Sequence, residues 1–477
     1  MKLFDKQSAQ LLERKVIKHE APGFRLMARA ALETWKMARK HSPRKIWCIA
    51  GPGNNGGDAI MTACFALLDH YEVSCSVLGQ PKGDALAALE FSKTIGLEIR
   101  KRLPDIKELK TGCDILIDGI LGVGTSRPPT GRLLSAINFI NEASAKKKVF
   151  VISIDLPSGL DPCSGQVLGQ SAVKADETIM LLSPKQACYT GHASKHVGTL
   201  VFSDLGITNY HKYGTKTSEL IKPDLFSVDK IPNISHKGSN GSILILGGWG
   251  NMQGAGFLAG LAAARTGVGK VFICTPNHNF RPMELIGIDS KLEDLKSCLK
   301  QVNVVVAGPG LNEKADEHLH LVWKSKLPLV LDAYGLRWLA QNNLPKRINN
   351  WIGTPHHGET IELLGKYKTE SNRFAQLTLL NKIYGGQWIL KGPGTLVGPN
   401  PTYVNNFANG ILATAGTGDV LAGIAGGMIA HGYSKAGALA TYIHSESARK
   451  ILTQKSSRLI ASDLLKNIGI VMNELEK

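Results

Sequence analysis

The sequence predicts an α/β fold in two domains, and three observations carry this prediction. The chain has 477 residues, more than one hydrophobic core usually accommodates, so two domains are expected. Short apolar runs rich in β-branched residues alternate with helical patterns, which is typical of parallel sheets covered by helices. Most of these runs end in a glycine-containing loop, as strands do at the ligand-binding edge of an open parallel sheet.

The first half begins with helices and continues with strands. Helical patterns cover residues 6–18 and 23–39. Four predicted strands follow, and their buried character fits the centre of a parallel sheet. They are KIWCIAG (45–51), EVSCSVLG (72–79), CDILIDGILG (113–122) and VFVISIDLPSG (149–159). The segments between them are amphipathic, so we expect connecting helices there.

The chain becomes polar and rich in turns between residues 207 and 235, which places the domain junction there. We predict a first domain at 1–210, a linker at 211–227 and a second domain at 228–477. A second series of strands follows: GSILILGG (241–248), KVFICTP (270–276), VNVVVAGPG (302–310), LPLVLDA (327–333) and GQWILKGPG (386–394). Residues 252–266 and 417–430 read as helices of small residues that pack closely on a sheet.

Composition excludes several classes of protein. Hydrophobic residues make up 43% and charged residues 20% of the chain, as in ordinary globular proteins. The net charge of +17 favours anionic ligands, but the lysines are scattered as on a solvated surface, so we expect no nucleic acid partner.

The eight cysteines never form CxxC, so we expect neither a zinc site nor a redox pair. No run reaches the roughly 18 apolar residues of a membrane helix, and no signal peptide opens the chain, so we expect a cytoplasmic protein.

Three strand ends predict an N-terminal pocket. IAGPGNNGGDAI (49–60) joins a strand to a helix, although such a loop by itself is equally consistent with a tight turn. Asp118 precedes GILGVGTSRP, and Asp155 begins DLPSGLD. An isolated aspartate in such a place is more often a helix cap or turn former, but three polar loops at one sheet edge favour a ligand site. Oxygen atoms of Asn55, Asp118 and Ser158 would suit a monovalent cation.

The string NGILATAGTGDVLAGIAGG (409–427) predicts a C-terminal anion site, because a loop of small residues runs directly into a helix. The N–H groups of Ala415, Gly416, Thr417 and Gly418 would face the anion at the positive end of the helix. Asp419 would be repelled there unless it has a task, and deprotonating a hydroxyl that attacks a nucleotide phosphate is such a task. A simple capped helix start is the alternative reading.

The first half resembles the NAD(P)H-hydrate epimerase domain over residues 5–207. The motifs GNNGGD, DGILGVGTSRPPTG, IDLPSGLD and AVKADETIMLLSPKQ carry the resemblance. It implies a Rossmann-like three-layer domain, potassium held by Asn55, Asp118 and Ser158, and Asp155 as the acid/base group. The residues implied to bind hydrated dinucleotide are Asn54, Asn55, Gly56, Gly57, Asp58, Gly122, Val123, Gly124, Thr125, Ser126, Arg127, Pro128 and Asp155.

The second half resembles the ADP-dependent NAD(P)H-hydrate dehydratase family, of ribokinase-like fold, over residues 228–477. HKGSNGSILILGG, NMQGAGFLAGLAAARTGVGKV, VVAGPGL, GTPHHGE, LKGPGT and the GTGD string carry this resemblance. It implies Asp419 as the catalytic residue and Mg²⁺ beside ADP. The implied nucleotide residues are Lys391, Gly392, Pro393, Gly394 and Thr395, with Gly418 of the helix start. The implied substrate residues are Ala255, Gly310, His356 and Asp419; His356 taken alone would more often be structural.

Together the resemblances imply repair of nicotinamide cofactors. One domain would interconvert the R and S forms of hydrated NADH and NADPH, and the other would dehydrate the S form with ADP to give NAD(P)H, AMP and phosphate. The sequence departs from the family patterns at Ala59, Trp249, Tyr334 and Ile411. A ribokinase-like small-molecule kinase with a non-catalytic dinucleotide-binding module is the alternative. A homo-oligomer and the choice between NADH and NADPH are left open.

Overall fold

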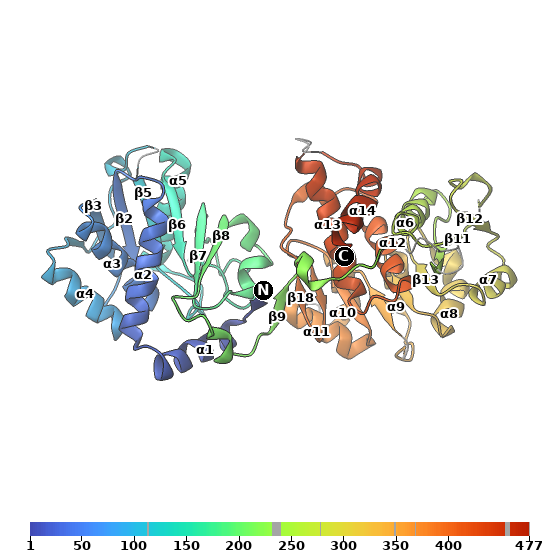
Figure 1. Cartoon of the computed structure of the whole chain (residues 1–477), viewed down its shortest axis with the longest axis horizontal. Coiled ribbons are helices and arrows are strands. Elements are labelled where there is room, and N and C mark those ends of the chain that lie inside the picture. The colour runs from blue at the N-terminus through green and yellow to red at the C-terminus, as the bar shows by residue number, and fades with distance from the viewer. Residues whose placement is uncertain are drawn as a thin grey trace. The chain divides into compact units, whose positions relative to one another are not determined.

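The computed structural model describes residues 1–111, 114–230, 240–276, 278–347, 350–367, 369–453 and 458–476. The chain divides into two compact units, Lys2–Glu219 and Leu220–Lys477, with Met1 joining the second (Figure 1). The predicted linker at 211–227 contains ordered elements, including β9 (Ser218–Leu220), which pairs antiparallel with β1 (Lys2–Leu3). Cys113 and the start of the HKGSNG string lie outside the described residues.

The N-terminal unit contains a parallel sheet with the strand order β4-β3-β2-β5-β6-β7-β8. The strands are β2 (Lys45–Ala50), β3 (Glu72–Val77), β4 (Ile99–Arg100), β5 (Asp114–Gly119), β6 (Phe150–Ile154), β7 (Glu177–Leu181) and β8 (Thr199–Ser203). The four predicted strands are confirmed, each slightly shorter than its apolar run. Sequence reasoning did not predict β7 or β8 as strands.

Helices cover both faces of this sheet, as the alternation of β2 shows. Ile46 and Cys48 belong to one buried cluster, with residues of α1, α2 and α3, whereas Trp47 and Ile49 belong to another, with residues of α5. The helices are α1 (Lys6–His19), α2 (Gly23–Arg39), α3 (Asn54–Leu68), α4 (Asp84–Thr94) and α5 (Gly131–Lys147). The helix–sheet–helix layering confirms the Rossmann-like three-layer prediction.

The C-terminal unit contains a larger sheet, in the order β18-β17-β16-β15-β14-β13-β10-β11-β12. The strands are β10 (Ser242–Leu246), β11 (Lys270–Cys274), β12 (Ile286–Ile288), β13 (Val304–Ala307), β14 (Leu329–Leu331), β15 (Trp351–Gly353), β16 (Gln387–Leu390), β17 (Leu396–Gly398) and β18 (Tyr403–Val404). They run parallel from β12 to β16 and antiparallel over β16, β17 and β18.

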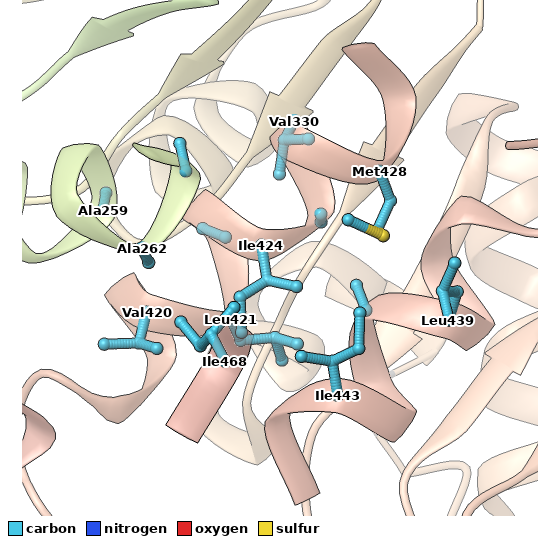
Figure 2. Close-up of a cluster of buried hydrophobic side chains, with 14 of the residues drawn as sticks. Ala259, Ala262, Val330, Val420, Leu421, Ile424, Met428, Leu439, Ile443 and Ile468 are labelled. Carbon is cyan, nitrogen blue, oxygen red and sulfur yellow. The ribbon is translucent and has the colours of Figure 1, made fainter. Parts of the chain in front are cut away.

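Four helices surround the main core of this unit: α6 (Gln253–Arg265), α12 (Thr417–Ala430), α13 (Ala436–Thr453) and α14 (Ala461–Leu475). Figure 2 shows Leu421 and Ile424 of α12 near Ile468 of α14. Small residues allow this packing, because a Cβ atom on Gly423 would lie 2.1 Å from the carbonyl oxygen of Ala259 in α6. The predicted helices at 252–266 and 417–430 are confirmed.

The remaining helices are α7 (Leu292–Leu299), α8 (Asp316–Lys324), α9 (Tyr334–Gln341), α10 (His357–Leu364) and α11 (Arg373–Tyr384). Of these, α7 to α10 follow strands of the same sheet, and α11 follows α10 and precedes β16. Among the helices of the described residues, none is both long and apolar enough to cross a membrane.

Candidate active sites

A cavity of about 490 Å³ opens in the N-terminal unit beside the loops that follow β2, β5, β6 and β7. Side chains of α1 and α2 also line it. The cavity brings together many of the predicted residues, namely Asn54, Asn55, Asp58, Gly122, Val123, Gly124, Thr125 and Asp155. The three strand-end loops therefore meet in one pocket.

Five predicted residues do not line this cavity: Gly56, Gly57, Ser126, Arg127 and Pro128. The two glycines pack the loop instead. A Cβ atom on Gly56 would lie 1.9 Å from the carbonyl oxygen of Gly51, and one on Gly57 would lie 2.4 Å from Met27 Cε. Residues 126–128 are exposed to solvent beyond Thr125. Ala59, where the family pattern has glycine, is fully buried beside Gly119.

The three predicted potassium ligands gather around the main chain of Leu121. Asn55 Nδ2 donates to the carbonyl oxygen of Leu121 at 2.9 Å, and Ser158 Oγ lies 3.1 Å from the same oxygen. Asp118 is completely buried and accepts hydrogen bonds from Ser158 Oγ (2.6 Å), Ser158 N (2.9 Å) and Ser153 Oγ (2.8 Å). Burial raises the pKa of Asp118, and these hydrogen bonds oppose the rise.

Asp155 lies at the cavity with a partner that sequence reasoning missed. Lys185, which follows β7, forms an ion pair through Nζ with Asp155 Oδ1, and its ammonium also donates to the carbonyl oxygen of Leu181 at 2.5 Å. The side chains of Lys185 and Asp155 are 6% and 15% exposed, so the pair is shielded from water. Asp155 adopts a positive φ of 66°, which is uncommon for a residue with a side chain. Lys185 lies in the string AVKADETIMLLSPKQ, and this string was the sequence signal that could have indicated it.

Three further carboxyl groups line the same cavity, those of Glu13, Asp58 and Asp84, and the pKa is raised for the first two. Desolvation raises the pKa of Asp58 well above its ordinary value, and the nearby charge of Asp155 adds to the rise. Desolvation likewise raises the pKa of Glu13 of α1, with Asp155 again contributing. The cavity thus combines a paired carboxylate at Asp155 with carboxyl groups that favour the protonated form.

In the C-terminal unit, the start of α12 forms the predicted small-residue turn. Gly416 has a φ of +89°, and a Cβ atom there would lie 2.6 Å from Leu258 Cδ1. The N–H groups of Ala415, Gly416 and Gly418 have no hydrogen bond in the described part of the chain. Thr417 differs from the expectation, because its N–H donates to the carbonyl oxygen of Thr414 at 3.4 Å. Its own carbonyl oxygen is 2.9 Å from Nε2 of the buried His444.

A cluster of charged side chains surrounds this turn. Lys391 Nζ lies 2.8 Å from Asp332 Oδ1 and 3.9 Å from Glu359 Oε2. A Cβ atom on Gly418 would lie 3.2 Å from Lys391 Nζ, so the helix start and the loop after β16 meet here. Burial raises the pKa of Asp419 to about 7; Asp332 adds to this and Lys391 opposes it. Burial opposes the charge of Lys391, but Asp332 and Glu359 outweigh it and raise the pKa of that lysine.

The predicted nucleotide loop, residues 391–395, follows β16 directly. Gly392 and Gly394 have positive φ values of 141° and 61°, a backbone that favours glycine. Arg373, at the first position of α11, donates hydrogen bonds to main-chain carbonyl oxygens of this loop. Sequence reasoning missed Arg373 because no motif links it to a loop that follows eighteen positions later.

The predicted substrate residues behave differently from one another. Gly310 and Ala255 are neighbours, since a Cβ atom on Gly310 would lie 3.0 Å from Ala255 Cβ. His356 caps α10: its Nδ1 accepts from Glu359 N at 3.3 Å, and its side chain is 60% exposed. His356 therefore has the structural role of a helix cap, which was the alternative to substrate binding. Its capping partner Glu359 lies 3.9 Å from Lys391 Nζ through Oε2.

The departures from the family pattern also have places in the structure. Trp249 is buried, and its main-chain N–H donates to the carbonyl oxygen of Gly310 at 2.8 Å. Tyr334 donates through its hydroxyl to Asp316 Oδ1 at 2.9 Å. Ile411 is buried in the core of the unit.

The fold and the two sites define a two-domain α/β protein whose C-terminal unit is ribokinase-like. A ribokinase-like superfamily protein from Enterococcus faecalis shares this fold, with a TM-score of 0.51 and 22% identity over 55% of this chain and 98% of that chain. A hypothetical protein from Streptococcus mutans is also similar, with a TM-score of 0.50 and 26% identity over 54% of this chain and 100% of that chain.

Family models match each unit. Residues 23–187 match the YjeF-related protein N-terminus, and residues 243–469 match NAD(P)H-hydrate dehydratase. The bifunctional NAD(P)H-hydrate repair enzyme of Coxiella burnetii is 34% identical over 99% of both chains. The Escherichia coli enzyme of the same name is 30% identical over 94% of this chain and 90% of that one. The chain belongs to the family of bifunctional NAD(P)H-hydrate repair enzymes.

Proposed function

We propose that the chain repairs hydrated NADH and NADPH by two reactions, one in each unit. The N-terminal cavity interconverts the R and S epimers, and the C-terminal site dehydrates the S epimer with ADP. The observation that carries the proposal is the position of Asp419 beside a turn with free N–H groups. Full-length similarity to repair enzymes supports both halves of the proposal.

In the N-terminal cavity, Asp155 is the acid/base group. Its carboxylate is held by Lys185 through Oδ1, and the cavity has room beside it for the hydrated ring and its ribose. A carboxylate in this place assists proton movements as the carbon–oxygen bond at the hydroxyl-bearing carbon opens and closes. The reaction changes configuration without any redox change.

A potassium ion fits the oxygen atoms near Leu121. Asp118, Ser158 and the main chain of Leu121 supply carboxylate, hydroxyl and carbonyl oxygens, a donor set suited to a hard cation. Asn55 donates through Nδ2 to the same carbonyl group, and its amide oxygen would be the further ligand. When bound, the ion supplies positive charge near the cavity. Gly56 and Gly57, which do not line the cavity, shape the loop that holds Asn55.

At the C-terminal site, Asp419 accepts the proton of the substrate hydroxyl as that oxygen attacks the β-phosphorus of ADP. The bond between the β-phosphorus and the bridging oxygen breaks, which releases AMP. The phosphate ester then eliminates phosphate, the neighbouring ring carbon loses a proton to solvent, and the ring double bond of NAD(P)H is regenerated. Backbone N–H groups at the start of α12 stabilise the charge on the transferred phosphoryl group.

We propose that Mg²⁺ enters this site with the nucleotide. Within the described residues no group of three or more His, Cys, Asp or Glu side chains could hold a metal ion, but Asp332, Glu359 and Asp419 lie around Lys391, and one or two of them would supply carboxylates to the ion. Magnesium ions typically use one or two carboxylates together with substrate phosphates. The ion would screen the charge of the nucleotide. The ligands of the chain are then hydrated NADH or NADPH and ADP. Neither reaction needs nucleic acid or a membrane, and we propose a cytoplasmic location.

The use of nucleotide tests this function against a small-molecule kinase. Hydrated NADH is incubated with the full chain, Mg²⁺ and either ADP or ATP, and the products are separated by chromatography. Repair predicts one AMP and one phosphate for each NADH regenerated with ADP. A stable phosphorylated alcohol with no NADH would instead identify a kinase.

A further inference from the structure

Arg373 donates hydrogen bonds to main-chain oxygen atoms of the segment 390–394. Nη1 donates to the carbonyl oxygens of Pro393 (2.6 Å) and Gly394 (2.9 Å). Nη2 donates to those of Leu390 (2.7 Å) and Lys391 (3.4 Å). Desolvation lowers the pKa of Arg373 to about 10, so the guanidinium remains charged at neutral pH.

The other carbonyl groups of the loop are also engaged. The oxygen of Gly392 accepts from Thr395 Oγ1 at 3.1 Å, and that of Thr395 accepts from Asn405 N at 2.9 Å. In contrast, the N–H groups of Gly392 and Thr395 have no hydrogen bond within the described part of the chain, and Pro393 has no N–H at all. The loop therefore offers donors to a ligand while its acceptors are occupied.

This polarity selects an anion. Free N–H groups on glycine-containing turns bind phosphate oxygens, whereas unpaired carbonyl oxygens in the same place would repel them. Lys391, whose ammonium lies beside Gly418, adds a positive charge between this loop and the start of α12.

We propose that Arg373 is a positioning residue for nucleotide binding: it holds the carbonyl groups of Leu390, Lys391, Pro393 and Gly394, so that the loop presents N–H groups and Lys391 to the phosphates of ADP. This inference rests on the proposed dehydratase function. The planar fork of a guanidinium reaches several oxygens at once, whereas a lysine ammonium acts as one point charge. Arg373→Lys is therefore only a partial replacement.

The chain contains a matched control for the test. Arg347 lies in the same unit, and its guanidinium also donates to main-chain oxygens, those of Val322, Trp323 and Leu327. Desolvation lowers its pKa to about 10 as well. Arg347→Met thus removes a comparable guanidinium that does not contact the nucleotide loop.

The experiment measures KM for ADP, KM for hydrated NADH and kcat in full-length Arg373→Met, Arg373→Lys and Arg347→Met. We expect Arg373→Met to raise KM for ADP by about tenfold or more, with KM for hydrated NADH unchanged and Arg373→Lys intermediate. Arg347→Met should leave KM for ADP within about twofold. Urea unfolding of each variant shows whether the C-terminal unit is folded, because epimerase activity belongs to the other unit.

An unchanged KM for ADP in Arg373→Met, with wild-type enzyme saturating normally with ADP, overturns the role of Arg373 and leaves the dehydratase function standing. Equal increases in Arg373→Met and Arg347→Met overturn it too, because they indicate general destabilisation. Failure of the wild-type chain to use ADP at all contradicts the proposed function itself. If Arg373→Met does not fold, Arg373→Lys and ADP titration calorimetry give the same comparison.

Discussion

Lys391 Nζ lies 2.8 Å from Asp332 Oδ1, and this pair sits between the nucleotide loop and the first turn of α12. The Asp332 side chain is only 2% exposed, and that of Lys391 is 19% exposed. Removing one member of such a pair leaves an uncompensated charge, which costs more than the pair itself contributes.

Lys391→Met should therefore lower the free energy of unfolding of the C-terminal unit by roughly 3 kcal/mol. The double variant Lys391→Met, Asp332→Asn should recover much of this loss, because it removes both charges. Urea unfolding followed by tryptophan fluorescence measures both values. A double variant no more stable than Lys391→Met would mean that the charge is not what destabilises it.

Asp419→Asn should reduce kcat for dehydration by about 10²- to 10⁴-fold, the usual contribution of a positioned base. Epimerase activity should be unchanged, since Asp155 and its cavity belong to the other unit. Initial rates with the pure S epimer and saturating ADP give the comparison. A variant that retains most of its kcat would remove Asp419 from the proposed chemistry.

The dehydration rate should depend on pH through Asp419. Its pKa is raised to about 7, and the base is the ionised form, so kcat/KM for dehydration should rise with pH to a plateau above about 7. Asp419→Asn should lack this step.

The linked effect on stability has the opposite sign: the folded state keeps the proton on Asp419 to a higher pH than the unfolded state, so stability falls as pH rises from about 4 to about 7. Melting temperatures across this range should fall less in Asp419→Asn.

Asp118→Asn should lower epimerase activity by about tenfold or more. The activity that is lost should be the part that depends on potassium. Asparagine carries no charge and cannot accept all the hydrogen bonds that Asp118 receives from Ser153 and Ser158. Epimerisation is measured against potassium concentration at constant ionic strength. Wild-type activity that is equal in sodium and potassium would contradict a specific potassium site.

Lys185→Met should impair epimerisation through Asp155, because it removes the cation that is paired with that carboxylate. We expect kcat to fall, as the carboxylate loses the ammonium group that holds it in place. Lys185→Arg should restore part of the activity. Urea unfolding of each variant shows whether the N-terminal unit is folded.

Local patterns predicted much of this fold. Apolar runs such as 45–51 became central strands, and the helices at 23–39 and 417–430 have the bounds that their patterns indicated. The strands β7 and β8 were missed because five-residue runs without a glycine loop directly after them carry a weak signal.

The site residues, like the strands, were predicted from the sequence where a local motif marked them and were missed elsewhere. Strand-end motifs located Asp118, Asp155 and Asp419, because loops after parallel strands share one edge. Lys185 and Arg373 were missed because their roles depend on contacts with residues far along the chain, which only the folded structure shows. The motif predicted that Gly56 and Gly57 line the cavity. In the structure, other residues of the same unit pack so closely against these two positions that only glycine fits there.

Repair by two sites in one chain is tested most directly with a mixture of R and S hydrated NADH, ADP, K⁺ and Mg²⁺. Absorbance of regenerated NADH is followed for the full chain, Asp155→Ala and Asp419→Asn. We predict that the wild type converts the whole mixture rapidly, that Asp155→Ala rapidly converts only the S fraction, and that Asp419→Asn regenerates almost none. Rapid and complete conversion by Asp155→Ala would contradict the assignment of epimerisation to the N-terminal cavity.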